Sequence, residues 1–86
     1  MKVIIVSTQF GDWEGLYIDD KLIDDGHELG EGDGKHYMLK ASEKYGFKLK
    51  NVKTCELNDE DEDTIADSGS FPKNYEELGE MELYDV

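Results

Sequence analysis

The sequence predicts a small α+β domain in which an antiparallel sheet of about four strands packs against one main helix. Segments with strand-like patterns come first along the chain, and one segment with helical periodicity follows them. The expected order is therefore β-β-β-α-β, followed by short helical pieces. A chain of 86 residues supports one small core, so we expect a single domain over residues 1–86. Its acidic segment, 56–86, is expected to be partly flexible.

The first three strands are predicted from apolar patterning. Residues 3–10 begin with a continuous aliphatic run, which is typical of a central strand buried on both faces. In the segment 13–23 two apolar stretches flank Asp19 and Asp20, which predicts a hairpin with a two-residue turn. The glycine-rich segment 24–34 has few apolar residues and is expected to be a loop.

The main helix is expected over residues 35–45, with Asp33 as its candidate N-cap and Gly46 as a left-handed stop. In the segment 47–57 a strand-like alternation changes phase at Asn51, which we interpret as a strand with a bulge. The apolar side chains of the helix form one stripe: Tyr37, Met38, Ala41 and Tyr45.

Shorter elements are expected after residue 57. Acidic residues in the first turn and Gly69 just past the end predict a short helix over residues 60–69. For residues 80–86 the pattern is compatible with an edge strand or a frayed tail. Between them, residues 71–78 predict a proline-initiated turn or short helix that docks three side chains on the core: Phe71, Tyr75 and Leu78.

Charge is distributed unevenly along the chain. The net charge is −13, yet residues 34–55 carry six lysines and one acidic residue, whereas residues 56–86 carry twelve acidic residues and one lysine. Residues 10–33 hold nine acidic residues and one lysine. We expect the basic block to neutralise part of one acidic block within the fold, which would leave the other as an uncompensated surface.

This composition restricts the classes of partner. All nine basic residues are lysine, and the overall field repels nucleic acid and anionic membranes, so direct binding to either is disfavoured and a basic protein partner is favoured. Cys55 is the only cysteine, which fits a reducing compartment. The apolar run near the N-terminus is too short for a signal peptide or a membrane span. These features predict a soluble cytosolic protein.

Four motifs suggest a metal, phosphate or catalytic site, but none is expected to form one. Asp59, Asp61 and Asp63 match the first positions of a calcium loop, but Thr64 and Ser70 stand where glycine and a bidentate glutamate are needed. The segment 27–34 matches no phosphate-binding spacing. Cys55 is expected in the core, and His27 and His36 on the surface. We therefore expect no enzyme, no catalytic residues, no bound metal and no cofactor.

The acidic side chains are the candidate binding site. Apolar residues are interleaved with them, so a fold would hold the carboxylates in place, and closely spaced carboxylates can imitate the field of duplex DNA. Trp13 and Tyr84 are candidate aromatic contacts beside an acidic rim. The first group of candidate partner-binding residues is Asp59, Glu60, Asp61, Glu62, Asp63 and Asp67, and the second is Asp19, Asp20, Asp24 and Asp25.

Several stretches resemble those of small bacteriophage proteins of unassigned function. They are 13-WEGLYIDDKLIDDGHEL-29, 45-YGFKLKNV-52 and 69-GSFPKNYEEL-78. These are turn and packing signatures, so the resemblance implies a shared fold and no active site. In size and acidity the chain is also similar to phage inhibitors of host defence, including anti-CRISPR and anti-restriction proteins that act as DNA mimics.

Two hypotheses of function follow. The first is a non-enzymatic phage-encoded inhibitor that occupies the basic nucleic-acid-binding surface of a host CRISPR effector, restriction enzyme or polymerase. The second is a small-ligand-binding or sequestering protein, in which the loop 24–34 and the aromatic residues shape a pocket at the interface of a homo-oligomer. A phage accessory protein fits the sequence as well.

Overall fold

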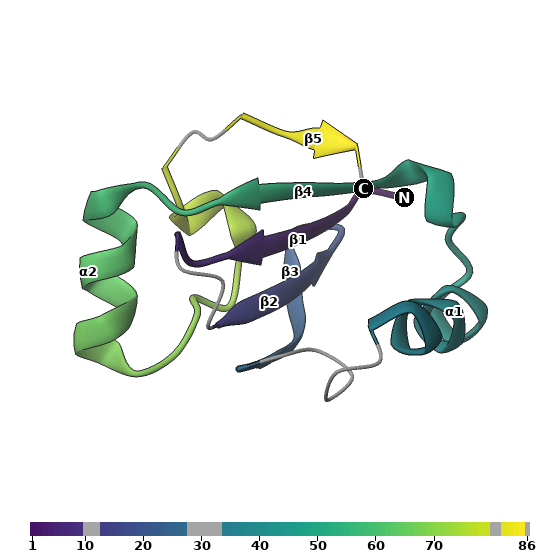
Figure 1. The fold of residues 1–86 in the computed structure, drawn as a ribbon, viewed down its shortest axis with the longest axis horizontal. Helices are drawn as coiled ribbons and strands as arrows, with labels where there is room; N and C mark the ends of the chain where they lie inside the picture. Colours follow the sequence, from purple (N-terminus) through teal and green to yellow (C-terminus); the bar gives the residue numbers. More distant parts are fainter. Residues whose placement is uncertain (10–12, 28–33, 80–81, 86) are drawn as a thin grey trace.

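The computed structural model describes residues 1–9, 13–27, 34–79 and 82–85. It contains a five-stranded sheet with strand order β3-β2-β1-β4-β5 and two α-helices (Figure 1). The elements are β1 (Val3–Ser7), β2 (Glu14–Ile18), β3 (Lys21–Gly26), α1 (Gly34–Tyr45), the 3-10 turn η1 (Leu49–Asn51), β4 (Val52–Glu56), α2 (Asp59–Ser68), the 3-10 turn η2 (Tyr75–Glu77) and β5 (Tyr84–Asp85).

The α+β class and the order of the elements are confirmed, but the sheet is mixed and not antiparallel throughout. β1 pairs antiparallel with β2 and parallel with β4. The reason is the helix between β3 and β4. β3 and β4 both run in the same direction as β1. Consecutive parallel strands require a crossover connection, and α1 provides it.

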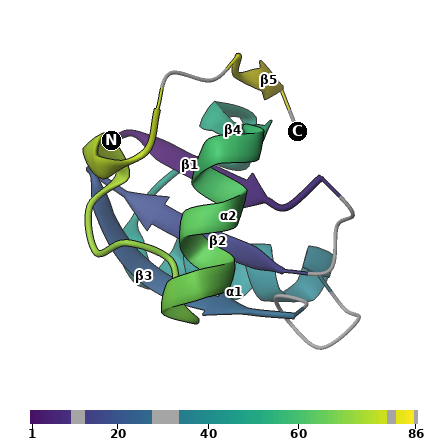
Figure 2. The same ribbon diagram turned by 90° about the vertical axis from the view of Figure 1, so that its left-hand side faces the viewer.

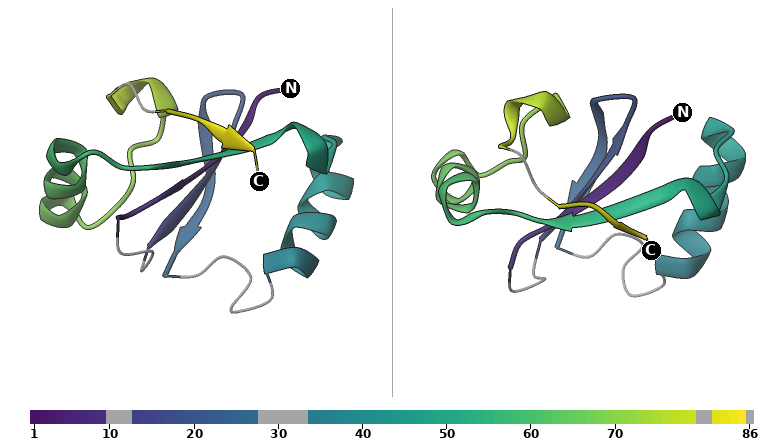
Figure 3. Two further views of the ribbon diagram at one scale, coloured as in Figure 1. Left: turned by 45° about the horizontal axis from the view of Figure 1, so that its top comes forward. Right: turned by 90° about the horizontal axis from the view of Figure 1, so that it is seen from above.

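The expected central strand is confirmed, because β1 is the middle strand and is covered on both faces. Val3 and Ile5 point to the face of α1, and Ile4 and Val6 point to the other face, which is covered by α2 and the segment around η2. Figure 2 shows α2 in front of the sheet and α1 behind it, and Figure 3 shows the two helices apart in two further views. The domain therefore has two small cores, one on each side of the sheet.

Each core contains the apolar residues expected from the sequence. Phe71 is buried, and Tyr75 and Leu78 pack against the same core, so the docking of the segment 71–78 is confirmed. On the α1 face the buried residues are Val3, Leu16, Ile18, Ala41, Phe47 and Val52, with Tyr37, Met38 and Tyr45 packed against them. On the α2 face they are Ile4, Val6, Tyr17, Cys55, Leu57, Ile65 and Phe71.

The predicted hairpin is confirmed, and both of its turn residues are left-handed. Asp19 has φ 48° and Asp20 has φ 76°, as in the tight turns that suit a twisted hairpin. Asn and Gly are the usual residues there, but each aspartate gains a hydrogen bond. Asp19 Oδ1 accepts one from the backbone N–H of Lys2 at 2.9 Å, and Asp20 Oδ1 accepts one from that of Glu76 at 2.8 Å.

Two boundaries differ from the prediction. The phase change in the segment 47–57 is the turn η1 ahead of β4 and not a bulge within a strand, because the chain must leave α1 and re-enter the sheet beside β1. β3 continues through Gly26, so the expected loop 24–34 begins as a strand. The candidate N-cap Asp33 lies outside the described residues. The C-terminal segment contains a two-residue edge strand, β5, paired with β4.

Gly15 is a position at which an added side chain would press on the core of the α2 face. A Cβ atom there would lie 3.2 Å from Cγ of the buried Phe71 ring, whereas a Cβ at Gly26 would meet nothing within 4 Å. We expect Gly15→Ala to lower the free energy of unfolding by about 1–3 kcal/mol through overpacking. Gly26→Ala, the control, should change it by no more than about 0.5 kcal/mol. Urea denaturation of both variants measures the difference, and equal stability of the two would contradict the close approach.

Candidate functional site

The helix α2 carries the first group of acidic candidates. Asn58 caps it, with Oδ1 accepting a hydrogen bond from the backbone N–H of Asp61 at 2.7 Å, and Gly69 ends it with φ 78°. Four acidic residues occupy its first turn, where the helix dipole favours negative charge. Ile65 is its one buried residue, at 2% exposure. The predicted second helix is thus confirmed.

Three of the six carboxylates attach α2 to the rest of the fold. Asp59 Oδ1 accepts a hydrogen bond from Nε2 of Gln9 at 2.7 Å, and Glu62 Oε2 accepts one from the backbone N–H of Gln9 at 3.2 Å. Asp61 Oδ2 accepts one from the backbone N–H of Gly79 at 2.8 Å. With only one apolar anchor in the helix, these polar contacts fix its orientation.

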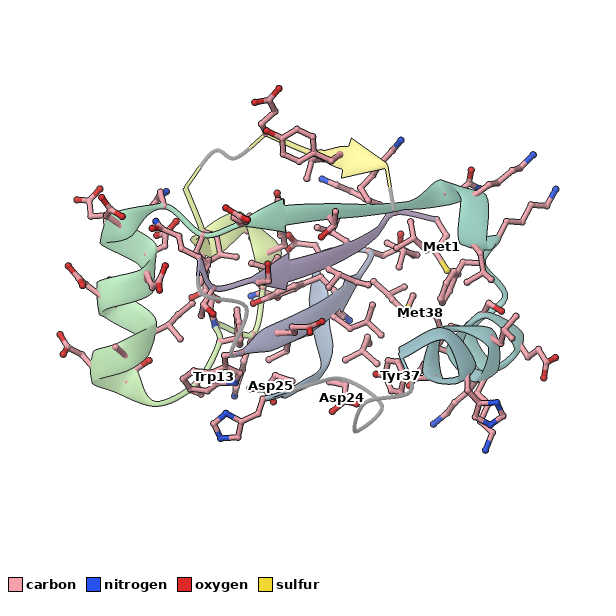
Figure 4. The ribbon with its side chains drawn as sticks, viewed as in Figure 1. Met1, Trp13, Asp24, Asp25, Tyr37 and Met38 are labelled. Atoms are coloured by element: carbon pink, nitrogen blue, oxygen red, sulfur yellow. The ribbon has the colours of Figure 1, made fainter. Side chains whose placement is uncertain are left out.

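The other three carboxylates form a stripe on the outer side of α2. Glu60, Asp63 and Asp67 are exposed and are spaced i, i+3 and i+7, so they share the helix face opposite Ile65. Figure 4 shows oxygen-tipped side chains projecting from α2 away from the sheet. We call these three residues the acidic stripe. A surface that approaches from outside meets it first.

The exposed lysine cluster and the acidic helix α2 lie at opposite ends of the molecule. Its longest dimension is 33 Å, and α1 and α2 lie toward the two ends of that axis (Figure 1). Exposed lysines cluster on α1 and around η1, beside Asp24 and away from α2, so the acidic block that they leave uncompensated is the one that contains α2. They are Lys40, Lys44, Lys48 and Lys50.

The structure does not bring the second group of aspartates together. Asp19 and Asp20 lie in the β2–β3 turn, and Asp24 and Asp25 lie toward the far end of β3. Asp24 follows Asp20 by four positions in the sequence, which corresponds to about 13 Å along a strand. Asp19 and Asp20 hold the turn, as described above, and Asp24 bonds to α1.

The two aromatic candidates have different surroundings. Trp13 is half-buried, with its ring centroid 5.5 Å from that of Phe71 and 6.5 Å from that of His27. It therefore supports the core of the α2 face. Tyr84 is 54% exposed on β5, and its hydroxyl donates a hydrogen bond to Glu82 at 3.0 Å.

A second feature is a cleft between β3 and α1, with a volume of about 340 Å³. Its β3 wall consists of Ile23 and Asp24. Its α1 wall is one continuous helical face made of Tyr37, Lys40, Ala41, Lys44 and Tyr45.

Asp24 and Tyr37 join the two walls of this cleft (Figure 4). The Tyr37 hydroxyl donates to Asp24 Oδ2 at 2.8 Å, and Asp24 Oδ1 accepts from the backbone N–H of Asp25 at 2.9 Å. Burial raises the pKa of Tyr37, and the hydrogen bond to Asp24 raises it further, because the aspartate favours the protonated phenol.

Cys55 is buried in β4, as expected, and burial raises the pKa of its thiol. Within the described residues, no three His, Cys, Asp or Glu side chains are grouped so that they could hold a metal ion. The described helices include none with the length and apolar character that crossing a membrane requires.

Comparison of the chain with protein-family models, curated proteins and solved structures gives no significant match. The residues of the acidic stripe and of the cleft are therefore the features that bear on function.

The carboxylates of α2 were predicted from the sequence, but the role of Gln9 and the cleft between β3 and α1 were not. Gln9 bridges β1 and α2, although it is fifty or more residues away from its partners, and no local pattern marks it. The cleft was missed because it forms between a strand and a helix that the sequence analysis treated separately. The i, i+4 spacing of Lys40 and Lys44 was the available signal.

The hydrogen bond across the cleft predicts a pKa change. In Asp24→Asn the pKa of Tyr37 should fall toward its ordinary value, because only burial and the nearby Tyr45 would then raise it. Asp25→Asn, the control, removes the neighbouring carboxylate and keeps the bond. The stability that a raised phenol pKa contributes is present below about pH 10 and is lost as pH rises through the folded value. A pH titration of the Tyr37 ring resonance by NMR measures the pKa, and equal values in Asp24→Asn and the wild type would contradict this account.

Proposed function

We propose that the protein is a non-enzymatic binding module that places α2 against a basic surface of a partner protein. The supporting observation is the acidic stripe: three exposed carboxylates on one face of a helix whose position is fixed by three other carboxylates. Because the lysine-rich end lies away from α2, the field around the stripe is uncompensated. Such a field accelerates association with a basic partner and selects against acidic ones.

The charge density of α2 favours a partner surface that ordinarily holds nucleic acid. Asp59 and Asp67 are eight residues apart, which is about 12 Å along a helix axis, and six carboxylates lie in that interval. Duplex DNA carries one charge per ~1.7 Å of axis, or about seven over the same length. A groove built for a nucleic-acid backbone would meet the three carboxylates of the acidic stripe directly, and the three carboxylates bonded to the fold would add to the field of α2.

This proposal extends to a class of target. A phage-encoded inhibitor of a host CRISPR effector, restriction enzyme or polymerase would act in this way, in the host cytosol, by occupying the basic groove. Support for that narrower reading comes from the charge density and from the resemblance in size and acidity described above.

Neutralising part of the stripe tests the proposal. We expect Asp63→Asn/Asp67→Asn to weaken partner binding at least about tenfold at low salt, because two charges at the contact are lost. The same change should raise the thermal midpoint slightly, because like charges at i, i+4 destabilise a helix by about 0.2–0.5 kcal/mol. The control, Glu43→Gln/Glu76→Gln, removes the same charge from exposed positions outside α2.

The wild type, the Asp63→Asn/Asp67→Asn variant and the control are immobilised and exposed to bacterial lysate. They are then washed at about 0.1 M and at about 1 M salt, because the Debye length falls from ~10 Å to ~3 Å between these concentrations. Nucleic-acid-binding proteins should be retained at low salt by the wild type and the control, and released by high salt or by added duplex DNA. Equal retention on the Asp63→Asn/Asp67→Asn variant, or retention that duplex DNA does not reverse, would exclude α2 as the contact.

The alternative, a pocket formed by the loop 24–34 at a subunit interface, depends in part on residues 28–33. Residues 28–33 lie outside the described part of the chain, and the cleft described above forms within one chain.

A further inference from the structure

We propose that the cleft between β3 and α1 is a binding site for a small aromatic carboxylate. The cleft is separate from the acidic stripe, because α1 and α2 lie toward opposite ends of the molecule (Figure 1). Its volume of about 340 Å³ falls at the lower end of the range of small-molecule sites, which begins at roughly 300 Å³. A ligand of one or two rings fits that size.

The hollow arises from the residue sizes along one face of α1. Ala41 lies four residues after Tyr37 and four before Tyr45, so a single methyl group separates two phenol rings along the helix. Ile23 faces this gap from β3 and remains 37% exposed. Two aromatic rings and two aliphatic side chains around an open volume favour a flat apolar body, because ring stacking and edge contacts add to burial.

Two lysines at the rim of the cleft favour a ligand with a negative charge. Lys40 and Lys44 are one helical turn apart on the rim, and both are exposed. The ammonium group of Lys44 lies 5.3 Å from the centroid of the Tyr45 ring, which keeps it beside the hollow. In a chain of net charge −13, a pair of cations beside an aromatic hollow is suited to an anionic group.

Asp24, on the β3 wall of the cleft, favours a ligand with a hydrogen-bond donor. Within the described part of the chain, its two oxygens each accept one hydrogen bond, from Tyr37 and from the backbone of Asp25, and a carboxylate has about four acceptor positions. Acceptor positions therefore remain for a donor on the ligand. The ligand chemistry is thus a carboxylate toward the lysines, a ring between the tyrosines, and an N–H or O–H group toward Asp24.

Indole-3-acetate has these three parts and serves as the probe. In a titration followed by amide NMR shifts, we expect millimolar binding, as is usual for so small a ligand, with the shifts centred on residues 23–24 and 37–45. Indole-3-acetamide, which lacks the charge, and acetate, which lacks the ring, should each bind at least about fivefold more weakly.

Paired lysine variants separate a built site from general attraction to lysine. Lys40→Gln/Lys44→Gln should weaken indole-3-acetate binding about tenfold. Lys48→Gln/Lys50→Gln, which removes equal charge around the neighbouring turn η1, should change it less than about twofold. Asp63→Asn/Asp67→Asn should leave it unchanged, so this test is independent of the function proposed for α2.

Three results would overturn the assignment: an equal loss of binding in the two lysine pairs, amide shifts centred away from the cleft, or binding of indole-3-acetamide as tight as that of indole-3-acetate. Amide spectra of the variants without probe verify that the fold is retained. All four lysines are exposed, so their replacement leaves the core residues in place.

Discussion

The rest of the structure depends on the burial of β1 on both faces. Val3 and Ile5 require a cover on one side of the sheet, and Ile4 and Val6 require one on the other. A chain of 86 residues meets both demands with one helix per face and gains two small cores in place of one larger core. Because the basic segment supplies one cover and the acidic segment supplies the other, this constraint also separates the charges.

Some carboxylates of α2 hold the helix in place and others are exposed, because the helix has only a small apolar contact with the core. Ile65 alone cannot set the rotation of a ten-residue helix. The hydrogen bonds that Asp59, Asp61 and Glu62 accept from Gln9 and Gly79 supply the missing constraints. Holding a dense row of negative charge in a helix costs stability through repulsion. A chain that retains such a row on an ordered, capped helix presents charge at fixed positions, which a disordered acidic tail would not do.

The cleft shows how the same helix can serve both core and surface. Tyr37, Ala41 and Tyr45 pack toward the sheet, while Lys40 and Lys44 on the adjoining edge of that face border the open volume. The bond between Tyr37 and Asp24 ties α1 to the outer strand β3 without filling the space between them. The two candidate sites thus occupy the two covers of one sheet and differ in charge.

Local patterns were sufficient to predict the elements. The aliphatic run of β1, the stripe of α1, the Asp19–Asp20 turn and the stop at Gly69 each depend on a few neighbouring residues, and each is present in the structure. The candidate carboxylates of α2 were found for the same reason. The parallel pairing of β1 with β4 was missed, because strand direction depends on where a crossover helix returns the chain, and residues 47–57 carry no mark of it.

The sequence by itself determined the type of each main element, the excess of negative charge and the location of that charge in the chain, because these properties depend on composition and short-range periodicity. Only the tertiary structure decided which carboxylates are structural and which are free, that Gln9 holds α2, that the second group of aspartates is divided, and that a lysine-lined cleft exists. Those features depend on pairs such as Gln9 with Asp59 or Asp24 with Tyr37, which packing around β1 brings together from distant parts of the chain.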